Sequence, residues 1–444
     1  MITNVEIKKL GINGEGIGYI NRKITFVKGA LPQEVVEVEI VEETKNYKVG
    51  NLIKVVKASK QRKESICNLS EFCLGCPLQN LNYEQQLYFK KDIIRDSLER
   101  YTELDLKRVD FRKCLPASKT TGYREIALLP IVRFHKRLKF GIFQRDSKYL
   151  TIMNTCQVQD PLINRCLNDL EAILNDNGAH SYNEDTRMGL RFLTLRVFEG
   201  KIQLIFVTGR DRLDYRLIEK MEELSYVESI YYTINVAKKD DFTRGRYEKV
   251  SGNTRGTLKI NKQKFIVSPK SDYFVNVSSL DAIIENVSSL LSNSVQSILE
   301  INSGIGWLSL NLDSKYQIKG IDFNRSNIDD AKLNARFLRK ENCTYEAGKL
   351  DELMPTLTKN LNFDAFIIHN NHLGMRQSVK DSIIRGRIKE IIYLSTSPSS
   401  FAKDVKDLEK YYRVETIIPV DELPQTQNVK IIAKLVRKDD KKRS

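Results

Sequence analysis

Three cysteines within ten residues form the densest group of reactive side chains in this 444-residue chain. They are Cys67, Cys73 and Cys76. Thiolates are soft ligands, so three of them in one short loop suit zinc or an iron–sulfur cluster. A fourth ligand must come from elsewhere, and Cys156 is the best candidate. The alternative is a loop of buried structural cysteines. A disulfide framework fits poorly, because the chain is long, has seven cysteines and shows no signal peptide, which predicts a reducing cytoplasm.

A second group of residues is suited to a nucleoside-type cofactor. Gly304 and Gly306 form a Gly-x-Gly turn in the stretch LEINSGIGWLSL, where a backbone can approach a ligand closely. Asp322 ends the next expected strand, twenty-two residues after Glu300, where a carboxylate can accept hydrogen bonds from a ribose. The same residues also fit a turn that serves packing alone, so both interpretations stay open.

The charge of the chain points to nucleic acid. The net charge of +15, from 72 basic and 57 acidic residues, favours an anionic partner, and each phosphate contact releases counterions. Basic and aromatic residues are interleaved between residues 133 and 143, an arrangement that binds phosphates and stacks unpaired bases. A merely solvated basic surface is the alternative. The candidate RNA-binding residues are Arg133, Lys136, Arg137 and Lys139.

The first part of the chain must position the cysteine loop. Residues 1–58 read as short strands with alternating apolar and polar positions, which predicts a small antiparallel barrel, a frequent platform for oligonucleotides. A basic linker leads into the cysteine loop, and apolar residues near helical spacing predict a helix over 83–101. From 105 to 270 strands dominate, interrupted by one helix over 160–176.

After residue 275 helices and strands alternate strictly, which describes a doubly wound sheet with an added terminal hairpin. We therefore expect a multidomain α/β protein with a small N-terminal β-barrel, a mixed α+β central domain that carries the metal loop, and a C-terminal doubly wound, Rossmann-like sheet. The predicted domain boundaries are 1–58, 59–270 and 271–444. No apolar run approaches the length that crosses a bilayer, so no membrane association is expected.

Over nearly its full length the sequence resembles the bacterial RNA uridine-carbon-5 methyltransferases that carry a TRAM barrel and an iron–sulfur cluster and act on 23S ribosomal RNA. The resemblance runs from GEGIGYI and VKGALPQEVVEVEI, through the cysteine loop and CPLQNLNYEQQL, to PQTQNVKIIAKL. It implies a four-iron–four-sulfur cluster on Cys67, Cys73, Cys76 and Cys156. It also implies an S-adenosylmethionine domain, with Asp322 as the ribose acid and the cofactor turn formed by Ser303, Gly304 and Gly306.

The two central catalytic positions of that family are substituted in this chain. Methylating carbon 5 of uracil requires a nucleophile that adds at carbon 6 and a base that removes the carbon-5 proton. The family's nucleophilic cysteine lies in a Val-Ser-Cys-Asn-Pro motif, where this chain has Thr396. The family's base is the glutamate of a His-Val-Glu motif, where this chain has Lys430. A threonine hydroxyl is far less acidic than a thiol, and a lysine is a poor proton acceptor at neutral pH.

Two further family motifs are also altered. The Asp-Pro-Pro-Arg loop reads His369, Asn370, Asn371 and His372, and Phe274 replaces a glutamine that contacts the cofactor. Phe274, together with the bulk of Trp307, predicts weakened cofactor binding. The two histidines also have a spacing that fits two metal ligands or an acid and a base, although a surface loop without such a role is the favoured interpretation.

The sequence therefore predicts an RNA-binding member of this family whose methyl-transfer chemistry has been lost. We expect a cytoplasmic monomer that binds 23S ribosomal RNA or assembling ribosomal particles. One alternative is an active S-adenosylmethionine-dependent 23S rRNA uridine-C5 methyltransferase with an unusual mechanism. Another is a regulatory partner of an active paralogue. Salt-dependent RNA binding separates the first hypothesis from the third, and methyl transfer separates the second from both.

Overall fold

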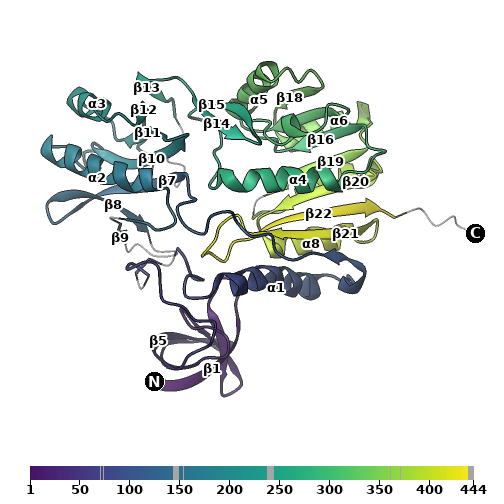
Figure 1. Cartoon of the computed structure of the whole chain (residues 1–444), viewed down its shortest axis with the longest axis horizontal. Helices are drawn as coiled ribbons and strands as arrows, with labels where there is room; N and C mark the ends of the chain where they lie inside the picture. The colour runs from purple at the N-terminus through teal and green to yellow at the C-terminus, as the bar shows by residue number, and fades with distance from the viewer. Residues whose placement is uncertain are drawn as a thin grey trace, which may run out of the picture. The chain divides into compact units, whose positions relative to one another are not determined.

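The structure is a computed structural model that describes residues 1–70, 72, 73, 75–143, 150–153, 155–237, 245–360, 362–370 and 372–438. The chain divides into two compact units. The first unit comprises Met1–Ser118, Asn370–Lys380 and Lys389–Ser444, and the second comprises Lys119–His369 and Asp381–Ile388. Figure 1 labels the helices and strands of both units.

The first unit begins with a closed five-stranded barrel, drawn in purple and dark blue in Figure 1. Its strands close in the order β1-β2-β3-β5-β4, and alternate residues such as Val5, Ile7 and Val36 fill the interior. The predicted barrel is confirmed, but its strands are not all antiparallel. β3 and β5 pair in parallel. The strand β4 lies between them in the sequence and brings the chain back to the end of the barrel at which β3 begins, so that β5 runs in the same direction as β3. The bounds are β1 Ile2–Leu10, β2 Gly16–Ile20, β3 Lys23–Val27, β4 Val35–Glu43 and β5 Tyr47–Lys57.

Helix α1 (Tyr83–Tyr101) follows the cysteine loop, and its bounds coincide with the predicted helix. Asn82 caps its first turn through the side-chain oxygen. Midway along the helix, the fully buried Lys90 forms an ion pair with the fully buried Asp421. The Nζ of Lys90 also donates to the carbonyl of Leu423 at 2.9 Å. These contacts anchor the helix to the loop that follows β21 (Tyr412–Val420).

The second unit contains a seven-stranded sheet of order β13-β12-β11-β10-β7-β8-β9. Only β11 and β12 pair in parallel among its described pairings. The predicted helix α2 (Pro161–Asp176) packs on β8, β10 and β11. A short helix, α3 (Tyr215–Glu222), was not predicted and packs on β12 and β13. The strands are β7 Ile126–Phe134, β8 Arg137–Phe143, β9 Leu150–Ile152, β10 Leu190–Phe198, β11 Lys201–Thr208, β12 Val227–Ile234 and β13 Glu248–Gly252.

The C-terminal part of the chain forms an eight-stranded sheet of order β18-β17-β16-β19-β20-β22-β21-β6. The strands β18, β17, β16 and β19 of the second unit run parallel. In the first unit β22 pairs antiparallel with β20 and β21, which confirms the predicted terminal hairpin on a Rossmann-like sheet. The remaining strands are β6 Asp110–Phe111, β16 Ser297–Ile301, β17 Gln317–Asp322, β18 Cys343–Ala347, β19 Ala365–Asn370, β20 Glu390–Ser395 and β22 Lys430–Arg437.

Two helices of this part, α8 and α5, have clear packing partners within their own units. In the first unit α8 lies against α1 and β20 (Figure 1). In the second unit α5 packs on β17 and β18 and on β15, which forms a small hairpin with β14. No helix in the described ranges is both long and apolar enough to cross a membrane. The elements are β14 Gly256–Ile260, β15 Gln263–Val267, α4 Leu280–Leu290, α5 Arg325–Phe337, α6 Leu350–Asn360, α7 Gln377–Arg385 and α8 Pro398–Leu408.

Candidate cofactor cradle and catalytic positions

The predicted glycine turn and the predicted acid lie in direct contact in the second unit. The backbone N–H of Gly304 donates to Oδ2 of Asp322 at 2.9 Å, and the N–H of Asn324 donates to Oδ1 of the same carboxylate at 2.8 Å. Burial raises the pKa of Asp322 above its ordinary value, while these two amides act in the opposite direction. A carboxylate can accept about four hydrogen bonds, so it retains capacity for a ribose hydroxyl.

The second glycine of the turn has a steric reason to be glycine. Gly306 has φ of 78°, a backbone region that residues with side chains rarely adopt. A Cβ at this position would lie 2.7 Å from the hydroxyl oxygen of Tyr345. Tyr345 is buried behind the turn and its hydroxyl lies 2.8 Å from Oγ of Ser309. The ring of Tyr345 therefore supports the turn from behind.

Two polar atoms beside the turn are buried without a protein partner among the described residues. They are Oγ of Ser303 and Oε2 of Glu300. Buried polar groups normally have hydrogen-bond partners, and an orphaned group often marks a ligand or a water. With the turn and Asp322, these atoms form a group of hydrogen-bonding partners that fits the nucleoside end of a cofactor. Ser303, Gly304, Gly306 and Asp322 are thus brought together as the sequence led us to expect.

A row of aromatic rings lies on the other side of the turn. The ring centroid of Trp307 lies 5.7 Å from that of Phe274 and 5.7 Å from that of His369, in edge-to-face geometry at both contacts. Nε2 of His369 lies 2.9 Å from Oε1 of Glu300, and the carbonyl of His369 accepts a hydrogen bond from Asn302 at 2.7 Å. Phe274 and His369, two of the substituted family positions, therefore pack on one tryptophan.

Lys430, the residue that the resemblance sets against the family's base, has an acidic partner. It is the first residue of β22, and its Nζ lies 3.1 Å from Oε1 of Glu422. The side chains of Lys430 and Glu422 are only 16% and 15% exposed. The nitrogen of a lysine held in an ion pair is directed at its acidic partner and not at a substrate.

Thr396 and His372 also lie in the first unit. Thr396 follows the last residue of β20 and is exposed, while the backbone carbonyl of His372 accepts a hydrogen bond from Oγ of Ser400 at 2.6 Å. No hydrogen bond or ion pair joins Thr396, Lys430 and His372 to one another in the part of the chain that the structure describes. Asn371, which belongs to the same altered loop, lies outside the described residues.

The cysteines predicted to bind metal are partly exposed. Cys67, Cys73 and Cys76 lie in consecutive turns of the first unit, and Cys156 precedes α2 in the second, where its N–H donates to Oδ1 of Asn164 at 3.0 Å. Across the described ranges, no three Cys, His, Asp or Glu side chains are grouped as a metal site would require. The ligand types suit a cluster, but the arrangement of these side chains does not show one.

Three of the four predicted RNA-binding residues lie at the tip of the β7–β8 hairpin. Arg133, Lys136 and Arg137 are exposed, and positive φ values at His135 and Lys136 make the tight turn between the strands. Lys139 differs from the other three, because it points to Glu171 of α2 and forms an ion pair with that residue. The hairpin tip therefore presents three cations to solvent.

Sequence reasoning did not anticipate the acidic partners of the substituted residues. Glu300 binds His369 and Glu422 binds Lys430, and neither acid was assigned a role. Glu300 carried one usable signal, since a carboxylate inside an apolar strand needs a partner. Glu422 carried none, because its contact with Lys430 depends on how the chain turns between β21 and β22.

The barrel, the parallel strands with their glycine turn, and the antiparallel terminal hairpin define a class: Rossmann-like methyltransferases with an added small β-barrel. Residues 82–438 match the family model of tRNA (uracil-5-)-methyltransferases, and residues 2–53 match that of the TRAM domain. The chain belongs to the tRNA (uracil-5-)-methyltransferase family. The predicted TRAM barrel is confirmed, and so is the predicted membership among RNA uracil-5 methyltransferases, while the iron–sulfur cluster and the 23S ribosomal RNA target stay predictions.

Relatives and solved structures agree with this assignment. A protein of Enterococcus faecalis described as an uncharacterized RNA methyltransferase is 30% identical over 446 residues, covering 98% of this chain and 97% of the relative. A Streptococcus agalactiae protein of the same description is 29% identical over 442 residues, covering 98% of each. The Pyrococcus abyssi tRNA (uracil-54, C5)-methyltransferase in complex with S-adenosyl-L-homocysteine has a TM-score of 0.78 at 24% identity, covering 98% of this chain and 100% of that one. This last likeness shows the fold.

Proposed function

We propose that this chain is an RNA-binding member of its family that does not methylate carbon 5 of uridine. The observation that carries the proposal is the ion pair between Lys430 and Glu422, at 3.1 Å, at the position of the family's base. Proton removal from carbon 5 needs a group with a free electron pair within hydrogen-bond reach. A lysine neutralised by a mostly buried glutamate is not such a group.

The position of the nucleophile supports the same proposal. Thr396 has an alcohol where the family has a thiol, and an alcohol needs a neighbouring base to attack a ring carbon. No side-chain hydrogen bond from Thr396 to a base is present among the described residues. Without addition at carbon 6, carbon 5 does not become nucleophilic. Tight RNA binding does not compensate for the loss of that step.

Two observations favour the second candidate, an active S-adenosylmethionine-dependent uridine methyltransferase. The cofactor turn keeps its Gly304–Asp322 contact, and a carboxylate, that of Glu422, stays close to the base position. The test compares 5-methyluridine in ribosomal RNA from cells with and without this gene, together with an assay of the purified protein. A mark that disappears with the gene and is rebuilt by the pure protein overturns the non-catalytic proposal.

Ribosomal RNA in the cytoplasm, free or in assembling particles, is the proposed partner of a monomeric protein. The net charge of +15, the TRAM barrel and the exposed cations Arg133, Lys136 and Arg137 support it. Replacing these three cations with glutamine is expected to weaken binding to structured RNA and to flatten its salt dependence. Salt-independent binding by the unaltered protein contradicts the proposal. Lys139→Gln is the matched control, because Lys139 is held by Glu171.

An iron–sulfur cluster is the proposed resident group of the cysteine loop. Its support is the donor set of Cys67, Cys73, Cys76 and Cys156, four thiols of partial exposure. Such a cluster would contribute folding free energy by cross-linking distant segments. Iron and labile sulfide, measured after anaerobic purification, are expected in the unaltered protein and lost in Cys156→Ser. The control is Cys343→Ser, a buried cysteine elsewhere. Zinc in place of iron contradicts the assignment.

A further inference from the structure

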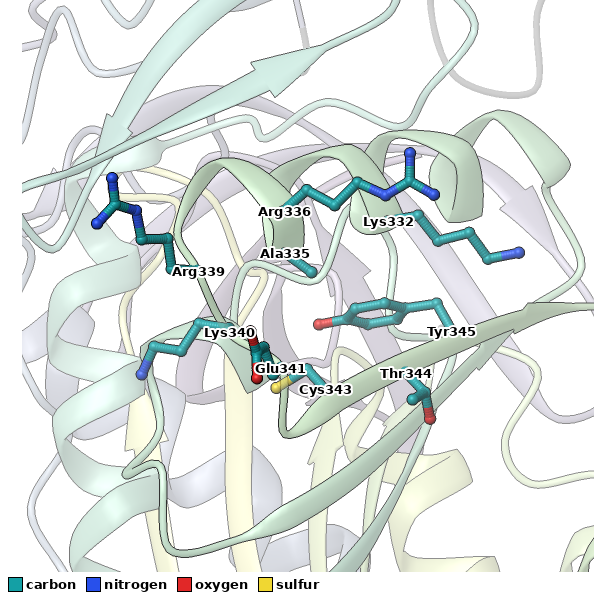
Figure 2. Close-up of a pocket in the computed structure, with 9 residues that line it drawn as sticks. All are labelled: Lys332, Ala335, Arg336, Arg339, Lys340, Glu341, Cys343, Thr344 and Tyr345. Carbon is teal, nitrogen blue, oxygen red and sulfur yellow. The ribbon is translucent and has the colours of Figure 1, made fainter.

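A pocket of about 530 Å³ lies between α5 and β18 in the second unit (Figure 2). Its volume falls in the range of pockets that hold small molecules or single groups of larger ligands. β18 is the last strand of the sheet on this side, so the pocket lies at the sheet edge. Its lining includes Lys332, Arg336, Arg339, Lys340, Cys343 and Tyr345.

Four cations rim this pocket. Lys332 and Arg336 are four residues apart on α5 and therefore share one face of the helix. Figure 2 shows these two side chains at one end of the pocket and those of Arg339 and Lys340 at the other. Arg339 follows the end of the helix, where its φ of 54° turns the chain toward β18. One acid, Glu341, also lines the pocket, which leaves a clear excess of positive charge.

Three exposed cations of the pocket have no acidic partner among the residues that the structure describes. Within the described ranges no carboxylate lies in ion-pair distance of Lys332, Arg336 or Arg339, whereas Nζ of Lys340 donates to the carbonyl of Leu312 at 3.1 Å. Cations gathered at one place repel one another, and an anion in the pocket relieves that repulsion. Arginine forks match the oxygens of a phosphate in number and geometry.

The floor of the pocket carries no negative charge. Burial raises the pKa of the Cys343 thiol to about 11, so it stays protonated at neutral pH. Burial likewise raises the pKa of Tyr345, whose hydroxyl is occupied by Ser309. The uncharged floor and cationic rim suit an anion with an apolar part next to it, such as a phosphate with its sugar. Tyr345 lies between this pocket and Gly306, so the pocket is separate from the cofactor turn.

We propose that this basic pocket at the α5–β18 edge binds backbone phosphates of the RNA partner. The proposal rests on the RNA-binding function proposed above and adds a contact surface on the Rossmann-like sheet to the hairpin tip of β7–β8. Each phosphate that the pocket neutralises releases counterions, which makes the contribution measurable from the salt dependence of binding.

The test compares two triple variants with the unaltered protein. The pocket variant is Lys332→Gln, Arg336→Gln and Arg339→Gln. The control variant removes the same charge at exposed cations that have carboxylate partners, Lys349→Gln, Arg385→Gln and Arg413→Gln. With single-stranded ribosomal RNA fragments, the slope of log affinity against log salt is expected to fall by about 2 in the pocket variant. The control is expected to keep the slope of the unaltered protein.

The outcomes separate this proposal from the function on which it rests. If the unaltered protein binds RNA and the pocket variant keeps its slope, the pocket assignment is wrong while RNA binding stands. If the unaltered protein does not bind RNA, both are wrong. Pyrophosphate at constant ionic strength is the second probe. Suppose that pyrophosphate raises the melting temperature of the unaltered protein but not that of the pocket variant, and that the two proteins have the same salt slope for RNA. The pocket then binds a small free anion, and the RNA assignment is overturned.

Discussion

Lys430 and Glu422 form an ion pair of 3.1 Å between Nζ and Oε1, with both side chains mostly buried. Lys430 opens β22, and Glu422 lies in the loop that leads from β21 to it. The pair thus joins the two ends of one loop, and its lysine is the residue that we propose stands in place of the family's catalytic base. Lys430 is therefore part of the packing of this chain. We expect that replacing Lys430 alone by glutamate lowers the free energy of unfolding.

Lys430→Glu is expected to destabilise the protein, because it places two carboxylates next to each other in a mostly buried site. The expected loss is about 2–4 kcal/mol of unfolding free energy, somewhat below that for a fully buried pair. Glu422→Gln combined with Lys430→Glu should recover much of it. Thermal denaturation measures both effects. Lys349→Glu, at an exposed pair with Glu352, is the control and should change little. Equal losses at the two sites contradict the prediction.

Thr396→Cys is expected to trap RNA covalently when S-adenosylmethionine is present. The introduced thiolate would add to carbon 6, and carbon 5 would then take the methyl group of S-adenosylmethionine, which leaves as S-adenosylhomocysteine. The adduct would persist because Lys430 does not remove the carbon-5 proton. Denaturing gels detect the adduct as an RNA-linked band. Thr396 is exposed at the end of β20, so the substitution should not disturb folding. Thr396→Ser is the control and should give no band. Turnover by Thr396→Cys without an adduct argues that another base is present.

Phe274→Gln is expected to tighten S-adenosylmethionine binding by about 5–10-fold, the value of one recovered hydrogen bond. Phe274 packs edge-to-face on Trp307, with 5.7 Å between the two ring centroids, and its side chain has no polar group. Calorimetry with S-adenosylmethionine measures the change. Phe274→Leu is the matched control, since it shortens the side chain without adding an amide. If leucine and glutamine tighten binding equally, steric bulk and not the missing amide limits the affinity.

Glu125 should make stability depend on pH. Burial, with a smaller contribution from Asp160, raises its pKa from 4.5 to about 7. Between these values the folded protein keeps a proton that the unfolded chain releases, so stability falls as pH rises through this range. Glu125→Gln removes the effect. The free energy of unfolding that Glu125→Gln gains over the unaltered protein is expected to be about 2–3 kcal/mol larger at pH 8 than at pH 5. Denaturant titrations at the two pH values measure this difference. The exposed Glu99→Gln should show no such difference, and a flat response of Glu125→Gln would falsify the assignment.

The buried pair of Lys90 and Asp421 should show strong coupling. Desolvation lowers the pKa of Lys90, and Asp421 raises it. Asp421→Asn leaves a buried ammonium without its counter-charge, and the expected cost is about 3–5 kcal/mol. Lys90→Met combined with Asp421→Asn removes both charges, and its stability should be nearer that of the unaltered protein than the stability of Lys90→Met or Asp421→Asn alone. Urea denaturation of the four proteins gives the coupling free energy. Additive single effects contradict the proposed pairing.

Local elements of the fold were predicted well because their signals are local. The bounds of α1 coincide with the predicted helix and those of α2 differ from the prediction by one residue, since apolar spacing and capping residues act within one element. The helix α3 was missed because its eight residues are too few for a clear periodic pattern. The parallel pairing of β3 with β5 was also missed, because strand direction depends on the connection through β4.

The sequence by itself determined the family, the TRAM barrel, the Rossmann-like sheet and the turn with Asp322. Motifs and apolar periodicity involve residues that are close together in sequence, so they can be recognised without the structure. Only the tertiary structure decided which side chains meet. The pairing of Lys430 with Glu422, the packing of Phe274 and His369 on Trp307, and the basic pocket beside β18 all depend on it. These contacts depend on strand order and on the paths of loops, which bring together residues with no shared pattern in sequence.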